Sequence, residues 1–246
     1  MDTIEIDRYC RTSPFFNFDP RVKLVAIISL IVTLSLMKGL MPLVIALVFI
    51  VVLQLTSRIP IKHSARIFVL SLPFIVVASG ALLLTSGWMP ALAMALRITS
   101  SVLALILLIS TTPFFDVLWA LRWFRVPYMI CSLLLLTYRY IFVMMEELEL
   151  MNMARRSRGF SLKGSLLSKD VFKTISFTAG MVLVRSHARS KDIYDGLVAR
   201  GYHKEIRILR RPKVRPGDAL LLLLFLGVIA LIVSLQWGLV QWSPLS

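Results

Sequence analysis

The chain has 246 residues, of which 58% are apolar and 17% are charged, whereas soluble domains average roughly 45–50% and 25%. It nevertheless carries 28 Lys and Arg against 13 Asp and Glu, a formal net charge of +15. This hydrophobicity excludes a soluble nucleic-acid-binding protein and a disordered basic tail, although either could carry such a charge. Apolar segments separated by basic ones are typical of an all-α protein that crosses the lipid bilayer several times.

The first 18 residues mix acidic and aromatic side chains, so we expect no cleavable signal peptide. Beyond them, five apolar segments predict membrane helices, because a helix in lipid satisfies its own backbone. The segments are Leu24–Met37, Leu40–Leu55, Ile67–Thr85, Met89–Thr112 and Ala219–Val240. The first two are short and predict a tight hairpin, and the next two are joined by the uncharged turn Ser86–Trp88.

Two further segments are ambiguous. Tyr128–Met145 contains Arg139, and Phe172–Val184 is short and contains Lys173 and Gly180. If the first of these crossed, the basic run at 155–158 would lie outside, against the excess of Lys and Arg that cytoplasmic loops carry. We therefore expect residues 113–218 on the cytoplasmic side, with both segments packed against the membrane domain.

Charge also predicts the orientation of the chain. Four basic residues precede Leu24, and residues 146–218 hold 16 Lys and Arg against 8 Asp and Glu. These numbers favour a cytoplasmic N-terminus, about five crossings and an outside C-terminus. The expected domains are a four-helix membrane domain over 1–112, a cytoplasmic domain of long helices over 113–218, and a final membrane helix with an outside tail over 219–246.

The cytoplasmic region contains the most informative pattern. Pro113–Val126 predicts a short amphipathic helix suited to the membrane interface, and Tyr128 to Arg158 predicts a long helix that ends at Gly159. Asp170–Arg200 predicts a second long helix that ends at Gly201. Both end in Arg-Gly-aromatic, the first with Phe160 and the second with Tyr202.

One Arg-Gly pair is ordinary helix termination. Its repetition at the ends of two long helices favours a binding function that is used twice. A guanidinium group suits a carboxylate or a carbonyl on a partner. Glycine allows close backbone approach, and the aromatic side chain supplies an apolar anchor.

These residues resemble a known family. Ala154–Phe160 and Leu197–Tyr202 look like the two Ala-Arg-Gly signatures of the T component of energy-coupling factor (ECF) transporters. The segments Ser13–Leu24, with its Asp-Pro-Arg-x-Lys-Leu, and Arg185–Tyr194 are similar to two other parts of that family. The similarity runs over nearly the whole chain and looks closest to the cobalt-transport branch, CbiQ.

The resemblance implies a non-catalytic membrane scaffold of an ATP-driven uptake transporter. Two long coupling helices would bind two copies of a cytoplasmic ABC ATPase of the CbiO type, and the membrane part would hold a substrate-binding subunit of the CbiM type. The implied ATPase contacts are Arg158, Gly159, Arg200 and Gly201. Possible supporting residues are Ala154, Arg155, Phe160, Ala199 and Tyr202. Ser157 departs from the family pattern, which has Ala there.

The resemblance also implies a location and a substrate. The chain would lie in the cell (inner) membrane of a bacterium or archaeon. Its substrate would be cobalt, with a link to cobalamin biosynthesis, through family likeness alone. Nickel and a vitamin stay open as alternatives.

The residues themselves indicate neither an enzyme nor a metal site. Gly159–Ser165 has its Lys at the wrong place for a phosphate loop, so ATP hydrolysis is expected in another chain. The cysteines Cys10 and Cys131, three scattered histidines and eleven Met suggest no metal site, and we expect no cofactor, catalytic residue or nucleic-acid partner.

Two other classes of protein fit the sequence less well. A self-sufficient secondary transporter would need inverted repeats and polar, broken helices, and a membrane-bound enzyme would need a catalytic cluster. Arg97 and Arg139 lie within apolar segments, where a charge is costly in lipid. They should face protein or the interface, and both structural pairing and a coupling role stay open for them.

Overall fold

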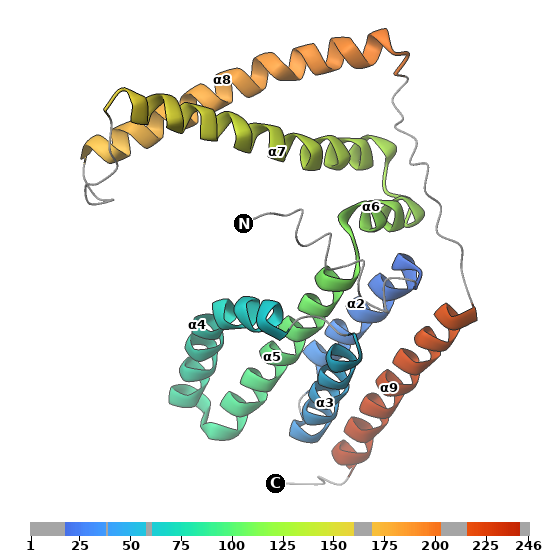
Figure 1. The fold of residues 1–246 in the computed structure, drawn as a ribbon. Helices are drawn as coiled ribbons and strands as arrows, with labels where there is room; N and C mark the ends of the chain where they lie inside the picture. Colours follow the sequence, from blue (N-terminus) through green and yellow to red (C-terminus); the bar gives the residue numbers. More distant parts are fainter. Residues whose placement is uncertain (1–17, 38, 58–60, 160–168, 203–215, 242–246) are drawn as a thin grey trace. The chain divides into compact units, whose positions relative to one another are not determined.

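The computed structural model describes residues 18–37, 39–57, 61–159, 169–202 and 216–241. Every element in these residues is an α-helix, which confirms the predicted all-α class. The chain divides into two compact units, Met1–Trp123 with Arg210–Ser246, and Phe124–Leu209. We describe each unit by itself, with the helix labels of Figure 1.

The first unit contains six of the described helices. They are α2 (Pro20–Leu36), α3 (Leu40–Thr56), α4 (Ile61–Ser86), α5 (Trp88–Thr111), α6 (Phe114–Trp123) and α9 (Pro216–Gln241). The sequence grouped the short amphipathic segment 113–126 with the cytoplasmic region, whereas α6 packs on α2 within the first unit. Which side of the membrane each unit faces stays a prediction.

Local residues explain where several of these helices begin. Asp19 is the N-cap of α2, with its side chain accepting a hydrogen bond from the Arg21 backbone N–H, and Pro20 occupies the first helical turn. Gly87 joins α4 to α5 with φ of 93°, a conformation that favours glycine. The uncharged turn predicted at Ser86–Trp88 is therefore confirmed.

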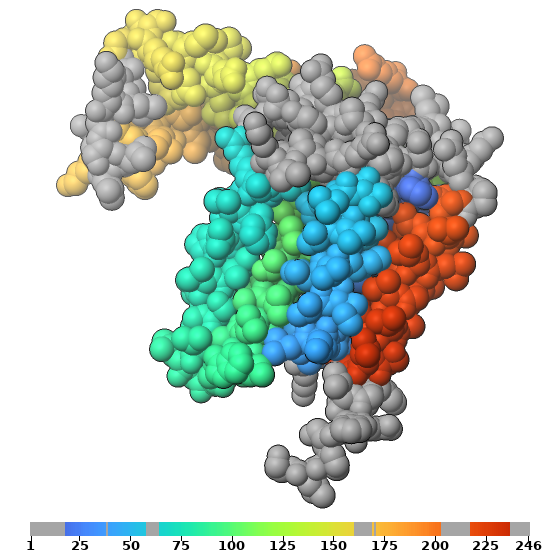
Figure 2. All heavy atoms as spheres, turned by 60° about the horizontal axis from the view of Figure 1, so that its bottom comes forward, coloured from blue at the N-terminus to red at the C-terminus, as the bar shows by residue number. Residues whose placement is uncertain are grey.

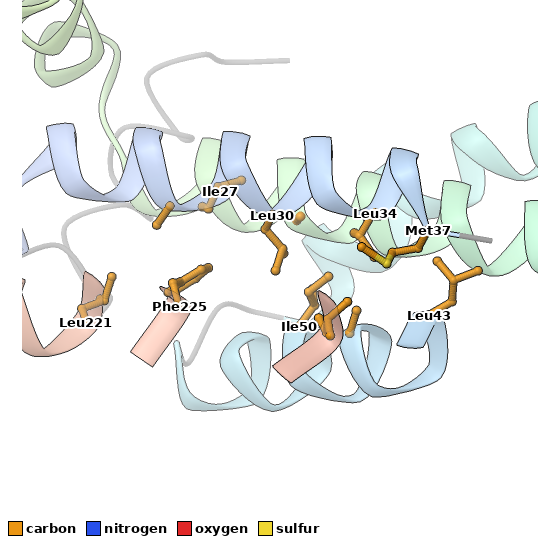
Figure 3. Packing of buried hydrophobic residues seen from close by; sticks show 12 residues of the cluster. Ile27, Leu30, Leu34, Met37, Leu43, Ile50, Leu221 and Phe225 are labelled. Atoms are coloured by element: carbon orange, nitrogen blue, oxygen red, sulfur yellow. The ribbon is translucent and has the colours of Figure 1, made fainter. Parts of the chain in front are cut away.

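The core of the first unit lies where α2, α3, α5 and α9 pack together. Figure 3 shows side chains of α2, among them Leu30, lying toward Ile50 of α3 and Phe225 of α9. Phe49 and Phe225 add an edge-to-face contact between α3 and α9, with ring centroids 5.3 Å apart. The last helix of the chain is thus packed into the same bundle as the first described ones.

The outer surface of this bundle is strongly apolar. On α4, Leu70 is 81% exposed and Leu84 is 87% exposed. Only 6% of the most apolar stretch of α4 is buried within the structure. Figure 2 shows the outer faces of α4, α3 and α9, and exposed Val and Leu side chains lie on all three. An apolar surface of this extent requires lipid or other membrane proteins to cover it.

Four described segments are long and apolar enough to cross a membrane: Ser64–Ser86, Trp88–Thr111, Tyr128–Ser157 and Gly217–Gln236. The chain is therefore an all-α membrane protein with several candidate crossings. The helices α2 and α3 have 17 residues each, or about 25 Å, which is short for a full crossing. Tyr128–Ser157 is long and apolar enough to cross, whereas the sequence predicted this segment on the cytoplasmic side. The number of crossings therefore stays a prediction.

Candidate functional site

The second unit consists of two long helices, α7 (Tyr128–Ser157) and α8 (Lys169–Ala199). Their predicted bounds are confirmed to within a residue at both C-terminal ends. Both helices end in the same backbone conformation, because Gly159 has φ of 80° and Gly201 has φ of 76°. Left-handed backbone of this kind is the usual way in which a glycine stops a helix.

Hydrogen bonds define the end of α8 completely. The Tyr202 N–H donates to the Leu197 carbonyl at 3.0 Å, and the Gly201 N–H donates to the Val198 carbonyl at 2.9 Å. This pair of bonds is a Schellman motif, and its usual apolar contact joins the two residues that here are Leu197 and Tyr202. Both of these side chains line one apolar groove.

The end of α7 repeats the second of these bonds. The Gly159 N–H donates to the Arg156 carbonyl at 3.0 Å, in the position equivalent to the Gly201 bond. Phe160, the predicted aromatic anchor of this end, lies outside the described residues. The two Arg-Gly signatures therefore share their backbone geometry as far as the structure describes it.

The two signature arginines are free to meet a partner. Arg158 and Arg200 are both exposed, and neither makes an ion pair with any residue that the structure describes. Gly159, Gly201, Ala154 and Ala199 are exposed as well. Exposed cations beside bare backbone can bind carboxylates or carbonyls of another chain.

Arg155 differs from its neighbours, because it is bonded within the unit. Its Nη1 donates to Thr178 Oγ1 at 2.6 Å, its Nε donates to the Met151 carbonyl at 3.4 Å, and its Nη2 donates to Asn152 Oδ1. Thr178 belongs to α8, so Arg155 joins the two helices. Within the signature, Arg155 therefore holds the end of α7 in position against α8.

A second connection lies about two to three turns away along the pair. Glu147 of α7 accepts a hydrogen bond from Arg185 and forms an ion pair with Arg189 at 3.6 Å, both from α8. These arginines belong to the segment Arg185–Tyr194, which resembles part of the ECF family. The sequence pattern singled them out but did not identify Glu147 as their partner.

The two signature ends lie at opposite ends of the antiparallel pair. Arg155 faces Thr178 near the start of α8, so the end of α8 lies 22 residues further along that helix, or about 33 Å away. Figure 1 shows α7 and α8 crossing near this point and spreading apart toward Tyr128 and Ala199. The structure therefore does not bring Arg158 and Arg200 together into one site, but presents two similar and separate ends.

An apolar groove of about 400 Å³ lies between the parts of α7 and α8 that spread apart. Its lining includes Met129, Leu133, Leu136, Ile193, Tyr194 and Leu197. Tyr194 and Leu197 are three positions apart on α8, so their side chains lie on one face of the helix, and both line the groove. Tyr202 lines the groove too, next to the Schellman motif.

The Asp-Pro-Arg-x-Lys segment lies in the first unit, where it connects several helices. The Asp19 N–H donates to Asp218 Oδ1 of α9 at 2.8 Å, and Lys23 Nζ donates to the Thr111 carbonyl of α5 at 3.3 Å. The Arg21 guanidinium lies 3.6 Å from the ring centroid of Trp119 in α6. The sequence offered no sign of these partners except the acidic position of Asp218 at the start of the last helix.

In the ranges that the structure describes, no group of three or more His, Cys, Asp or Glu side chains is placed to hold a metal ion. Cys131 is buried in α7. The candidate site is the pair of exposed helix ends at Arg158 and Arg200.

Comparison with known proteins agrees with the family resemblance found in the sequence. The model of a family described as cobalt transport protein, CbiQ, matches residues 11–209, which include both helix ends. The cobalt transport protein CbiQ of Rhodobacter capsulatus is 30% identical over 173 residues, covering 66% of this chain and 69% of that protein.

Two uncharacterised proteins of Methanocaldococcus jannaschii are also similar to the chain. One is 24% identical over 261 aligned positions, covering 96% of this chain and 88% of its own length. The other is 27% identical over 114 residues, covering 46% of this chain and 41% of its own length.

Proposed function

The chain belongs to the CbiQ family of cobalt transport proteins, and on that premise we propose that it is the transmembrane scaffold of an ATP-driven ECF transporter that takes up cobalt. It is a membrane transport component by family. ATP hydrolysis belongs to two copies of an ABC ATPase, and the metal is bound by a separate membrane subunit. The complex lies in the cell membrane, with the N-terminus of this chain in the cytoplasm.

The observation that carries the proposal is the repeated helix end. Arg158 and Arg200 are exposed cations at two ends with the same left-handed glycine geometry, about 33 Å apart along the helix pair. Two equivalent ends suit two copies of one partner. Each guanidinium would bind a carboxylate or a backbone carbonyl in a groove of one ATPase.

The contacts between α7 and α8 explain how such binding could be coupled to transport. Arg155 and Glu147 join the helices at their crossing, whereas the other halves spread apart around the groove. If each end is attached to one ATPase, a change in the distance between the ATPases changes the angle between the helices. The second unit would transmit that change to the membrane subunits.

The proposal of cobalt as the substrate rests on the family description. Cobalt is named for the family and for the relative in Rhodobacter capsulatus, which favours cobalt over nickel or a vitamin. Uptake of radioactive cobalt and of nickel by cells with the complete transporter would separate the two metals.

The test is charge reversal at both helix ends. The variant Arg158→Glu with Arg200→Glu should reduce co-purification of the ATPases at least tenfold and stop ATP-dependent uptake, while the chain still inserts in the membrane. The matched control Lys173→Glu with Lys191→Glu changes the net charge equally at two exposed positions of α8 and should retain the ATPases. Full assembly and transport by the Arg158 and Arg200 variant would overturn the proposal.

A further inference from the structure

Among the residues that the structure describes, Arg97 of the first unit is a cation without a charged partner. It is the one charged residue of α5. Its Nη2 donates to the carbonyl of Met37, the C-cap of α2. Its Nε is buried and has no hydrogen-bond partner among the residues that the structure describes. A single carbonyl satisfies little of the hydrogen-bonding capacity of a guanidinium group.

The described helices of the bundle offer no counter-ion close to Arg97. The sequence has no Asp or Glu between Asp19 and Asp116. Asp19 and Asp218 lie together at the opposite end of α2 from Met37, where Asp218 accepts the Asp19 N–H. The described residues thus leave Arg97 without a carboxylate, and a membrane partner can supply one.

The register of α2 and α5 places Arg97 at the base of a notch. Lys23 contacts Thr111, and Met37 contacts Arg97. Each helix advances 14 residues between these contacts, or about 21 Å. The turn after α2 therefore lies level with Arg97, and α5 continues for nine more residues to Trp88, or about 13 Å further.

A cavity of about 430 Å³ occupies the resulting step. Its lining comes from the start of α3, the end of α4 and the first part of α5, namely Leu40, Leu82, Met89, Ala93, Met94 and Arg97. We call this cavity the Arg97 notch. It is apolar except for the guanidinium group at its base.

On the side of α4 and α5 the surroundings of the notch are apolar, whereas Lys38 follows Met37 in the sequence after α2. No charged residue occurs between Arg66 and Arg97, and the tip of the hairpin beyond the notch exposes Leu84 and Trp88. Tryptophan at a helix end lies at the level of the lipid headgroups. Arg97 then lies more than a turn below that level, where an unpaired charge is costly.

We propose that the Arg97 notch binds a membrane-embedded segment of a partner protein, through an Asp or Glu that pairs with Arg97 and apolar side chains that fill the rest. A lipid phosphate would have to sink below the headgroup level to reach the same group. The guanidinium would repel a metal ion, so the notch is a docking site and not a cobalt path. The identification of the partner as the substrate-binding membrane subunit rests on the proposed function.

The experiment compares Arg97→Met, Arg97→Glu and Arg97→Lys in the complete transporter, with Arg66→Met as a control that removes an exposed charge from the far end of the same hairpin. Arg97→Met and Arg97→Glu should each lower the co-purified membrane subunit at least tenfold while the ATPases stay bound. Arg97→Lys should retain more of the subunit. In the Arg97→Glu background, changing one acidic residue in the membrane segments of the subunit to Arg should restore it.

Other outcomes would overturn the proposal. Retention of the subunit by Arg97→Met would show that Arg97 only caps α2, and loss of a bound phospholipid in native mass spectra instead of the subunit would make lipid the occupant. If Arg97→Met fails to fold, Arg97→Lys and the swapped pair decide the question. Failure here leaves the ATPase test unaffected, because the Arg158 and Arg200 variant should lose the ATPases but keep the membrane subunit.

Discussion

Glycine at two positions shows how single residues shape the candidate site. Gly159 and Gly201 have φ of 80° and 76°, and a Cβ at either position would meet no atom within 4 Å. Within this chain, glycine is therefore needed at these positions for its backbone conformation. The open space where a Cβ would stand is available to a partner. The sequence predicted these ends because a helix stop depends on neighbouring residues.

Replacement by alanine should change the free energy of unfolding in opposite directions at the glycines after the helix ends and at the glycines inside α8. Gly159→Ala and Gly201→Ala should each lower the free energy of unfolding by about 1 kcal/mol, since left-handed backbone is unfavourable for alanine. The matched controls Gly180→Ala and Gly196→Ala lie inside α8, also with open space, and should raise it by about 0.5–1 kcal/mol. Unfolding midpoints in detergent measure both effects, and a common sign in all four variants would contradict the account.

Residue roles within one signature were harder to predict than its position. Arg155 and Arg158 are three positions apart in a basic run, yet Arg155 is bonded to Thr178 while Arg158 is exposed. Local chemistry ranks the two equally as cations in a last helical turn, and only the family resemblance distinguished Arg158 as a contact from Arg155 as a supporting residue. The difference depends on where α8 crosses, which no local pattern encodes.

The pairs between α7 and α8 are partly exposed, and this limits their strength. The side chains of Arg185, Arg189 and Glu147 are 48%, 44% and 22% exposed. Ion pairs in such surroundings contribute about 0.2–1 kcal/mol each. Together with the groove, this weak connection is consistent with an angle between the helices that changes during a transport cycle.

The connection between α2 and α9 is different, because it is buried. Asp19 and Asp218 are 2% and 0% exposed. Asp218→Ala should destabilise the chain by about 1–3 kcal/mol, because the buried Asp19 N–H loses its acceptor. Asp218→Asn retains an acceptor oxygen and should cost less. Equal unfolding midpoints for the two variants would contradict this role.

The helices themselves could be predicted, but their connections could not. Apolar length and Gly or Pro residues indicated most helix bounds to within about four residues, whereas α4 begins at Ile61, six residues before the predicted segment. Asp19 and Asp218 are 199 positions apart, and Arg21 meets Trp119 in another helix. Such contacts depend on the packing of the whole bundle, so a local sequence pattern does not reveal them.

The topology of the whole molecule can be tested with single cysteines in a background without Cys10 and Cys131. Ser86→Cys should react with an impermeant reagent from outside the cell, because it lies in the uncharged turn. Ser157→Cys should react only after the membrane is opened, because the basic end of α7 is predicted to be cytoplasmic. Labelling of Ser157→Cys from outside would show that α7 crosses the membrane.

The division into two units matches the two kinds of partner that the proposed scaffold would bind. The first unit buries α2 among α3, α5 and α9 and presents an apolar outer face to lipid and membrane partners. The second unit presents two exposed arginine ends. More than half of the Lys and Arg lie between Glu146 and Asp218, and the net charge is shared almost equally between the units, +8 in the first and +7 in the second.

The most direct test of this account is the mass of the purified transporter in native mass spectrometry. The account predicts one copy of this chain with two copies of the ATPase. It predicts no bound ATPase in the Arg158→Glu, Arg200→Glu variant and two copies in the Lys173→Glu, Lys191→Glu control. Two ATPase copies bound to the Arg158→Glu, Arg200→Glu variant would contradict the claim that the two helix ends hold the ATPases.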